Sequence, residues 1–367
     1  MLYYNIEFLR LIFTVAILLG HMALINLFSG QTIAQNYIAN YSICVEFFFI
    51  IAGYFFFNEV KKTNNSNSNN EIINFITRKF SRLMPIFIFV LILQILFSTF
   101  HIIEQRPYLK QEFLKIFFIH EIGINYIETI PLKNNFYTTN VPAWFIAVYF
   151  WISLFYFYLL KNFNNKKVHF SMILITYLSF LFYLRVPTLF YVYKLLRGFY
   201  SFGIGYFFGM FCNWYRNNYN IFDIKRKTKI IFTIIEIIAL SQIFKTIFIK
   251  QYINDLNLYF IIMLCILLFS FIFNKGYIGQ LLNHKIFGFM GKYCYSIYMI
   301  QYIIQITIAP GNKLMQTQFY SSFRSNYPNI DLITSIIIII LSGVLAYYFV
   351  EKPSKKYLNN KFGAVLK

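Results

Sequence analysis

The chain of 367 residues is 59% hydrophobic and 22% aromatic, and only 13% of its residues are charged. A soluble protein needs roughly a quarter of its residues charged to cover its surface, so soluble, disordered and disulfide-stapled folds are excluded. The formal charge is +20, but the basic residues lie in short clusters between long apolar runs, as membrane loops do. The composition therefore predicts an all-α polytopic membrane protein that binds no nucleic acid.

Apolar runs long enough to span a bilayer, each about 20 residues, follow one another along the chain. We predict about ten transmembrane helices, near 6–28, 37–58, 84–104, 142–160, 169–187, 196–214, 230–249, 256–273, 288–308 and 331–350. No room remains for a soluble domain. We therefore expect one transmembrane domain over 1–357 and a short basic cytoplasmic tail over 358–367.

The distribution of lysine and arginine predicts the orientation of these spans. The loops after even-numbered spans, together with the C-terminal tail, hold roughly twice as many basic residues as the other loops. Both termini are therefore expected in the cytoplasm, as is the segment 59–83 with its polar tract Asn64–Asn70. The longest outer segment is 105–141. Gly205 and Gly209 form a GxxxG pattern in the sixth span, which is typical of close helix packing.

The first span carries three ionisable residues, Glu7, Arg10 and His21. Ionisable groups in a bilayer are costly unless they are paired, so each is a candidate functional residue. Arg10 and His21 fall within about 20° of one helical face and lie roughly 16 Å apart along the axis. Glu7 is one turn before Arg10 and can pair with it. The alternative is that Glu7 and Arg10 extend to the interface and His21 packs in the core.

Glu46 lies in the second span, about nine residues from its outer end, at a depth similar to that of His21. A carboxylate at that depth can orient an imidazole and stabilise its protonated form. The alternative is that Glu46 pairs with a lysine or a buried amide.

Three basic residues, Arg78, Lys79 and Arg82, precede Pro85 at the inner end of the third span. Arg78 and Arg82 are one helical turn apart, so they present two guanidinium groups to one place, which suits phosphate. The alternative is an ordinary positive-inside anchor. The histidines and cysteines lack metal-ligand spacing, so no metal site is expected.

Several of these segments, taken together, resemble the motifs of the acyltransferase-3 family of integral-membrane O-acyltransferases, and they occur in the family's order. The similar segments are Arg10-x10-His21, CVEFFFIIAGYFF (44–56), RKFSRLMP (78–85), GKYCYSIYMIQ (291–301) and YYFVEKP (347–353). The sequence departs from the family pattern at Ala52, which replaces a serine, and at Gln301, where histidine is common. PAWFIAVYF (142–150) keeps the family's tryptophan but lacks its glutamate.

The resemblance implies transfer of an acyl group, usually acetyl, from cytoplasmic acyl-CoA to a hydroxyl of a cell-envelope glycan or lipid-linked sugar. It also implies a multi-pass protein of the bacterial inner membrane, surrounded by membrane lipid. His21 is then a general base or a transient acyl carrier, supported by Glu46 and Arg10. Coenzyme A, as a polyanion, is expected on Arg10, Arg78, Lys79 and Arg82.

The acceptor is expected near Trp144, Ser296 and Tyr298, although a tryptophan at the membrane interface is more often an anchor. The main alternative function is a transporter or flippase for a lipid-linked glycan, but the chain shows no broken helices in matching halves. A glycan polymerase is a second alternative, for which the outer loops are small. The sequence assigns no oligomeric state.

Overall fold

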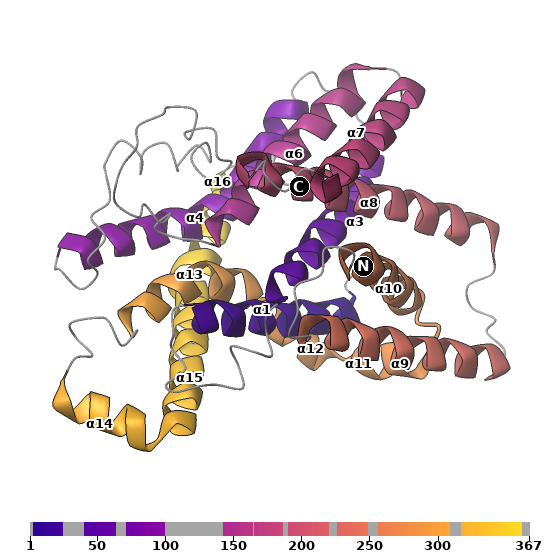
Figure 1. Cartoon of the computed structure of the whole chain (residues 1–367). Coiled ribbons are helices and arrows are strands. Elements are labelled where there is room, and N and C mark those ends of the chain that lie inside the picture. The colour runs from indigo at the N-terminus through magenta and orange to yellow at the C-terminus, as the bar shows by residue number, and fades with distance from the viewer. Residues whose placement is uncertain are drawn as a thin grey trace. The chain divides into compact units, whose positions relative to one another are not determined.

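The computed structural model describes residues 3–24, 40–63, 71–99, 142–163, 165–185, 190–219, 226–248, 256–308 and 317–361. These ranges are helical and contain no strand (Figure 1), which confirms the all-α prediction. The segments 105–141 and Asn64–Asn70 lie outside the described residues.

The helices that match the predicted spans begin and end close to the apolar runs, except at α4 and α13. They are α1 (Tyr4–Leu24), α3 (Cys44–Thr63) after the short η1 (Tyr41–Ile43), α4 (Glu71–Thr99), α6 (Ala143–Asn162), α7 (Asn165–Arg185), α8 (Phe190–Asn218), α9 (Arg226–Phe248), α10 (Leu256–Ile272), α13 (Cys294–Thr307) and α15 (Pro328–Ala346). The remaining elements are α11 (Tyr277–Leu282), α12 (Lys285–Gly291), α14 (Gln318–Asn326), η5 (Tyr347–Glu351) and α16 (Lys352–Lys361).

Within the described ranges, seven helices are long and apolar enough to cross a membrane, and α10 is a shorter apolar helix. The protein is therefore a multi-pass membrane protein. The count of ten spans and the cytoplasmic position of both termini stay predictions.

The predicted span 288–308 is wrong as one helix. The chain forms α12 up to Gly291, turns at Lys292 and Tyr293, and only then begins α13. Two glycines, Gly288 and Gly291, lower the helix propensity of this stretch. The average hydrophobicity of residues 288–308 does not reveal the turn at Lys292 and Tyr293.

The third predicted span also differs, because α4 begins at Glu71, well before residue 84. The polar stretch 71–83 is helical because one of its faces is buried, as Phe75 (1% exposed) and Leu83 (5% exposed) show. A buried apolar stripe of this kind stabilises a helix. The hydrophobicity averaged over consecutive residues does not reveal it, because the polar faces lower the average.

The chain divides into two compact units. Unit 1 comprises Met1–Ala23, Thr32–Glu59 and Ser201–Cys294, and unit 2 comprises Leu24–Gln31, Val60–Tyr200 and Tyr295–Lys367. In unit 1, Phe13 of α1 packs against Phe47 of α3, with ring centroids 4.4 Å apart. A β-carbon at Gly205 of α8 would collide with the backbone of Ile50 in α3, so the GxxxG pattern does mark close helix packing.

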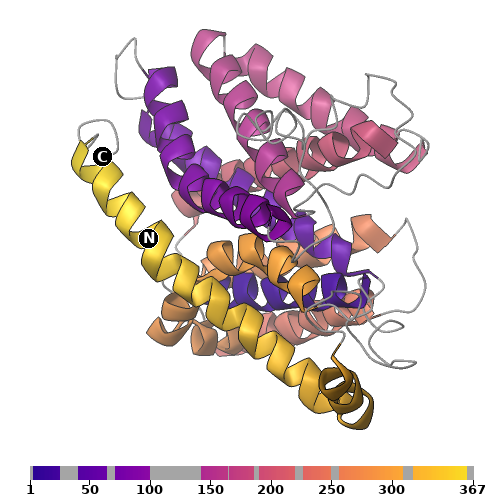
Figure 2. The ribbon, with the colours of Figure 1, turned by 90° about the vertical axis from the view of Figure 1, so that its left-hand side faces the viewer.

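In unit 2, α4 and α6 pack antiparallel. Phe75 stacks on Phe157 with ring centroids 4.1 Å apart, and Glu71 at the start of α4 pairs with Lys161 at the end of α6. A second feature of this unit is a long rod in which α15 continues through the π-helical turn η5 into α16 (Figure 2). The rod carries the helix past residue 357, to Lys361.

Candidate functional site

The polar residues of α1 are held in place by neighbours in unit 1. The backbone N–H of Tyr4 donates to Asn283 Oδ1 at 3.1 Å. Asn5 Nδ2 donates to the carbonyl of Phe271 at 2.8 Å and to that of Gly279 at 3.2 Å. These bonds fix the start of α1 against α10 and α11, so the side chains one turn further along have a defined position.

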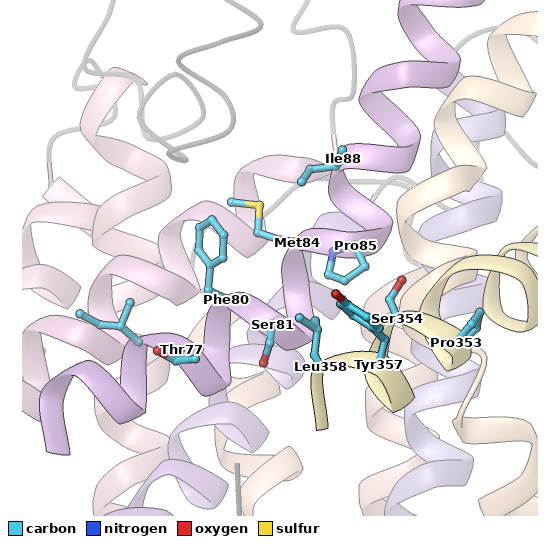
Figure 3. A pocket seen from close by; sticks show the side chains of 11 residues that line it. Thr77, Phe80, Ser81, Met84, Pro85, Ile88, Pro353, Ser354, Tyr357 and Leu358 are labelled. Carbon is cyan, nitrogen blue, oxygen red and sulfur yellow. The ribbon is translucent and has the colours of Figure 1, made fainter. Parts of the chain in front are cut away.

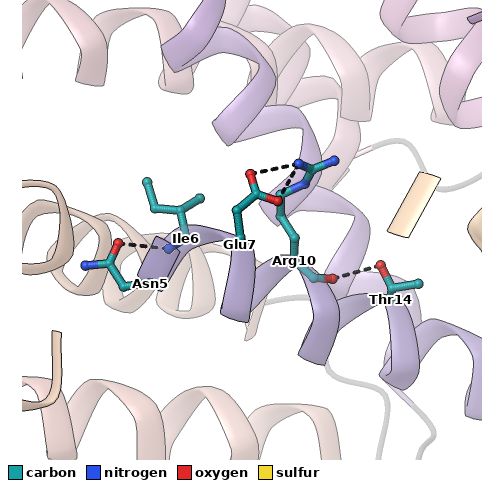
Figure 4. Close-up of polar contacts among 5 residues, drawn as sticks. All are labelled: Asn5, Ile6, Glu7, Arg10 and Thr14. Carbon is teal, nitrogen blue, oxygen red and sulfur yellow. Dashed lines mark hydrogen bonds and ion pairs between the residues drawn. The ribbon is translucent and has the colours of Figure 1, made fainter. Parts of the chain in front are cut away.

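Glu7 and Arg10 form the ion pair that the sequence predicts. Arg10 Nη1 donates to both carboxylate oxygens of Glu7, at 2.9 and 2.8 Å (Figure 4). Thr14 Oγ1 donates to the carbonyl of Arg10 at 2.8 Å, which continues the polar stripe along α1. The side chains of Arg10 and Glu7 are 22% and 16% exposed, so the pair is largely enclosed.

Gly291, the last residue of α12, allows the Glu7 carboxylate to lie close to the backbone. A β-carbon at residue 291 would collide with the Glu7 side chain. Gly291, the glycine of the segment GKYCYSIYMIQ, therefore leaves the room that the Glu7 side chain of the Glu7–Arg10 pair needs.

His21 lies in the last turn of α1 and is 7% exposed. Its ring meets the ring of Tyr41 edge-on, with centroids 5.3 Å apart. Tyr41 belongs to η1 and also fills the space that a side chain at Gly20 would need. The imidazole is therefore packed edge-on against an aromatic ring in the last turn of α1.

Glu46 is fully buried in the first turn of α3. A negative charge is favoured there by the helix dipole. His21 lies in the last turn of α1, Tyr41 begins η1 and Glu46 lies in the first turn of α3, so both candidate catalytic residues lie near helix ends of unit 1. A direct contact between His21 and Glu46 stays a prediction.

A further buried carboxylate, Glu236 in α9, was missed in the sequence. It is 0% exposed and accepts hydrogen bonds from Ser270 Oγ at 2.6 Å and from the N–H groups of Ile278 and Gly279 at 3.0 and 3.2 Å. Its position near the middle of an apolar span was the available signal. Because three donors satisfy it, we assign it to holding α11, and through α11 the start of α1.

The basic segment of α4 divides into two parts in unit 2. Lys79 is 9% exposed; its Nζ donates to Tyr149 Oη at 2.9 Å and lies 5.0 Å from the ring centroid of Phe75. Arg82 is exposed and Arg78 is half-buried. Lys79 therefore faces α6, while a shared phosphate site at Arg78 and Arg82 stays a prediction.

Tyr298 of α13 contacts the start of α6, the helix that carries Trp144, in unit 2. Tyr298 Oη donates to the carbonyl of Pro142 at 2.9 Å, and its ring lies edge-on to Phe145 at 5.9 Å. Trp144 lies in the first turn of α6, between Pro142 and Phe145 in the sequence. A shared acceptor site at Trp144 and Tyr298 stays a prediction.

Two cations beside Trp144 were missed. Lys194 Nζ lies 5.8 Å and Arg197 Cζ 5.4 Å from the Trp144 ring centroid, and Arg197 is 6% exposed. Their spacing of three residues on a helix was a usable signal. The predicted span 196–214 begins between these two residues, whereas α8 begins at Phe190.

Ser296 is fully buried, and its hydroxyl donates to Glu351 Oε2 at 2.5 Å. The preceding residue, Tyr295, donates to the carbonyl of Leu83 at 2.6 Å. Consecutive residues of α13 thus contact η5 and the α4 backbone next to Arg82. Binding of an acceptor by Ser296 stays a prediction, and its partner Glu351 was missed as a contact.

Metal ligands do not gather in the described ranges, where no group of three His, Cys, Asp or Glu side chains could hold an ion. The candidate residues of unit 1 are instead a buried histidine, buried carboxylates and an ion-paired arginine inside apolar helices. That combination defines a membrane-embedded protein with a polar centre suited to acid–base chemistry and to anions.

The chain belongs to the acyltransferase-3 family, whose family model, described as an acyltransferase domain, matches residues 3–365. The protein is therefore a membrane acyltransferase that transfers acyl groups other than amino-acyl groups, which confirms the resemblance seen in the sequence. No curated protein and no solved structure matches this chain.

Proposed function

We propose that the protein moves an acyl group, in the first instance acetyl, from cytoplasmic acyl-CoA to a hydroxyl of a cell-envelope glycan or lipid-linked sugar. We place it in the bacterial inner membrane. The observation that carries the proposal is the buried His21, packed at the end of α1 whose other turns hold the Glu7–Arg10 pair. An enclosed imidazole on a helix with a fixed arginine suits proton transfer beside an anionic substrate.

His21 acts as the general base in this proposal. It takes the proton of the acceptor hydroxyl while the hydroxyl oxygen attacks the thioester carbonyl. The carbon–sulfur bond then breaks, and the coenzyme A thiolate leaves and takes up the proton from the imidazolium. Glu46, fully buried in the first turn of α3, stabilises the imidazolium. A general base contributes roughly 10²–10⁴-fold to the rate.

The donor binds through its phosphates. Arg78 and Arg82 of unit 2 lie one turn apart, and Arg82 is exposed, so the fork is available to a polyanion. Arg10 is the third arginine assigned to the donor, and its pairing with Glu7 holds one guanidinium edge in a defined direction. Lys79 contributes by fixing α4 to α6 through Tyr149.

The acceptor sugar binds near Trp144. A sugar ring stacks on an indole through its apolar face, and Tyr298 holds the backbone at the start of α6 in position. Lys194 and Arg197 lie over the same ring, which adds positive charge beside the sugar.

The test is the number of acyl groups per sugar repeat on envelope glycan from cells that carry each variant. His21→Ala should abolish detectable O-acylation, whereas His169→Ala in α7, a histidine outside the proposed site, should leave it at the wild-type level. Both proteins must be present in the membrane at wild-type amounts. Normal acylation with His21→Ala overturns the mechanism. A fall in the amount of surface glycan with unchanged acylation per repeat indicates a flippase.

The orientation has its own test. A reporter fused after Lys367 or within Asn64–Asn70 should report the cytoplasm, and one near Asn134 should report the opposite side. A cytoplasmic signal at Asn134 contradicts the proposed topology.

A further inference from the structure

Gln94, near the end of α4, is a buried polar side chain to which the proposed reaction gives no role. It is 1% exposed, and neither its amide oxygen nor its amide nitrogen has a hydrogen-bond partner in the part of the chain that the structure describes. An unpaired buried amide destabilises a protein, and native proteins keep few such groups. Gln94 also lies in a helix long and apolar enough to cross a membrane, where polar side chains are costly and usually functional.

The face of α4 that carries Gln94 is turned toward the protein interior. Phe87, Val90, Leu91 and Gln94 are all buried. Counted from Phe87, the other three follow at three, four and seven residues, which is the spacing of one helical face. Gln94 therefore continues the buried stripe of α4 and does not face lipid.

A pocket with a volume of about 880 Å³ lies between α4 and α16 (Figure 3), but Gln94 is not one of its lining residues. The lining residues nearest to Gln94 in the sequence are Pro85 and Ile88. They lie about 180° and 120° around α4 from Gln94, at about 100° per residue. The pocket therefore does not provide a partner for the unpaired amide.

The packing of α6 on α4 gives a scale of depth in unit 2. The two helices are antiparallel, and the ring of Phe80 lies edge-on to that of Phe150 with centroids 6.4 Å apart. Pro142 is eight residues before Phe150. Because both helices rise 1.5 Å per residue in opposite directions, Pro142 lies at about the depth of Ile88 in α4.

Helix α13 runs in the same direction as α4. Tyr295 Oη donates to the carbonyl of Leu83, and Tyr298 Oη donates to that of Pro142. The second of these contacts lies at the greater depth, since Pro142 is at the level of Ile88. The chain therefore moves toward the end of α4 as it passes from Tyr295 to Tyr298.

This direction brings buried amides of two helices to a similar depth. Gln94 is about 16 Å beyond Leu83 along α4, and Gln305 is about 15 Å beyond Tyr295 along α13. Gln301 lies about one turn before Gln305. Both glutamines of α13 are 0% exposed. Three buried amides thus lie within about one helical turn in depth in unit 2.

We propose that Gln94, together with Gln301 and Gln305, binds hydroxyl groups of the acceptor sugar. An amide side chain places a hydrogen-bond donor beside an acceptor, and neighbouring hydroxyls of a sugar ring match that pair. Tyr298, already assigned to the acceptor, lies two turns before Gln305 on the same face of α13, whereas Arg82 of the donor site is about 18 Å from Gln94 along α4. The inference rests on the proposed function and adds the polar contacts that hold the sugar.

The first experiment compares melting temperatures in detergent without substrate. Gln94→Leu replaces an unpaired amide by hydrocarbon of similar size, so the melting temperature should rise by about 2 °C or more. Gln242→Leu is the matched control, because Gln242 is half-buried in α9, another apolar helix. No rise in Gln94→Leu means that bound water satisfies the amide, and an equal rise in Gln242→Leu means that added hydrophobicity explains it. Either result overturns the proposal.

The second experiment measures transfer of radiolabelled acetyl from acetyl-CoA to envelope glycan isolated from cells that lack the protein. Gln94→Leu should raise the KM for the glycan about ten-fold, which is the usual contribution of one hydrogen bond. The KM for acetyl-CoA should not change, and Gln242→Leu should match wild type in both. A rise in the KM for acetyl-CoA alone means that the amide binds the donor's pantetheine arm, which overturns the proposal.

A third variant tests the amides of α13. Gln305→Leu should also raise the KM for the glycan, whatever its melting temperature. A wild-type KM for the glycan in Gln94→Leu or in Gln305→Leu contradicts the shared site and leaves the proposed function intact. If the wild-type protein itself transfers no acetyl group, the proposed function fails, and this inference fails with it.

Discussion

The arginine of α1 and the arginine fork of α4 are presented in opposite ways. Arg10 has both oxygens of Glu7 on one guanidinium nitrogen, and Gly291 leaves room for that carboxylate. Arg82 is exposed on α4, next to a backbone carbonyl held by Tyr295. The difference shows that the same residue type is a fixed, ion-paired group in one unit and an exposed cation in the other.

Between the two arginine sites, the larger effect is expected at Arg10. Arg10→Ala leaves Glu7 enclosed without its cation and removes a fixed positive charge from the proposed site, so acyl transfer should fall about a hundred-fold or more. The measurement is acyl groups per sugar repeat, normalised to protein in the membrane. Arg10→Lys keeps the ion pair and should retain more activity. If Arg10→Ala behaves like wild type, the pair is only an interfacial anchor.

The next effect concerns the space around Glu7. Gly291→Ala places a methyl group against the Glu7 carboxylate, and overpacking of this kind costs about 1–3 kcal/mol. We expect a lower melting temperature in detergent, accompanied by reduced acylation. Gly288→Ala in the same helix controls for the loss of a glycine. A Gly291→Ala protein that melts later than wild type contradicts the close approach of α12 to Glu7.

A smaller effect is expected at the exposed fork. Arg78→Ala and Arg82→Ala should each weaken acyl-CoA binding about ten-fold, since charge-assisted hydrogen bonds near the surface are screened by water. Arg78→Lys should be intermediate, because lysine keeps the charge but loses the planar fork. Isothermal titration with the purified variants measures this. If both alanine variants bind acyl-CoA with wild-type affinity, Arg78 and Arg82 serve only as a positive-inside topology anchor.

The smallest effect is expected when Lys79 loses its hydrogen bond to Tyr149, and it tests whether Lys79 binds the donor as Arg78 and Arg82 are proposed to do. Tyr149→Phe removes the hydrogen bond to Lys79 Nζ and should lower stability by about 1 kcal/mol. Donor affinity should change little, because the fork itself is intact. A loss of acyl-CoA affinity as large as that of Arg82→Ala would place Lys79 among the donor's ligands.

The helical fold and the family were accessible from the sequence because they depend on local patterns. Long apolar runs identify spans whatever their neighbours are, and the ordered motifs from Arg10 to YYFVEKP pointed to the family that the comparison confirms. The Glu7–Arg10 pair was predictable for the same reason, since residues one turn apart on a helix face each other.

The contacts between distant segments were not accessible. The partners of Lys79, Ser296 and Glu236 lie in other helices, and nothing in a run of hydrophobic residues encodes which faces meet. The two cations over Trp144 were missed because α8 begins before its apolar run.

The sequence by itself therefore determined that the protein is a helical membrane protein, because composition and helical periodicity are properties of single segments, and its ordered motifs pointed to an acyltransferase. Only the tertiary structure decided where the helix at 288–308 breaks, which carboxylates are satisfied and which arginines are exposed. These outcomes depend on whether a facing helix supplies a donor, an aromatic ring or the space left by a glycine, and that is set by packing between segments far apart in the chain.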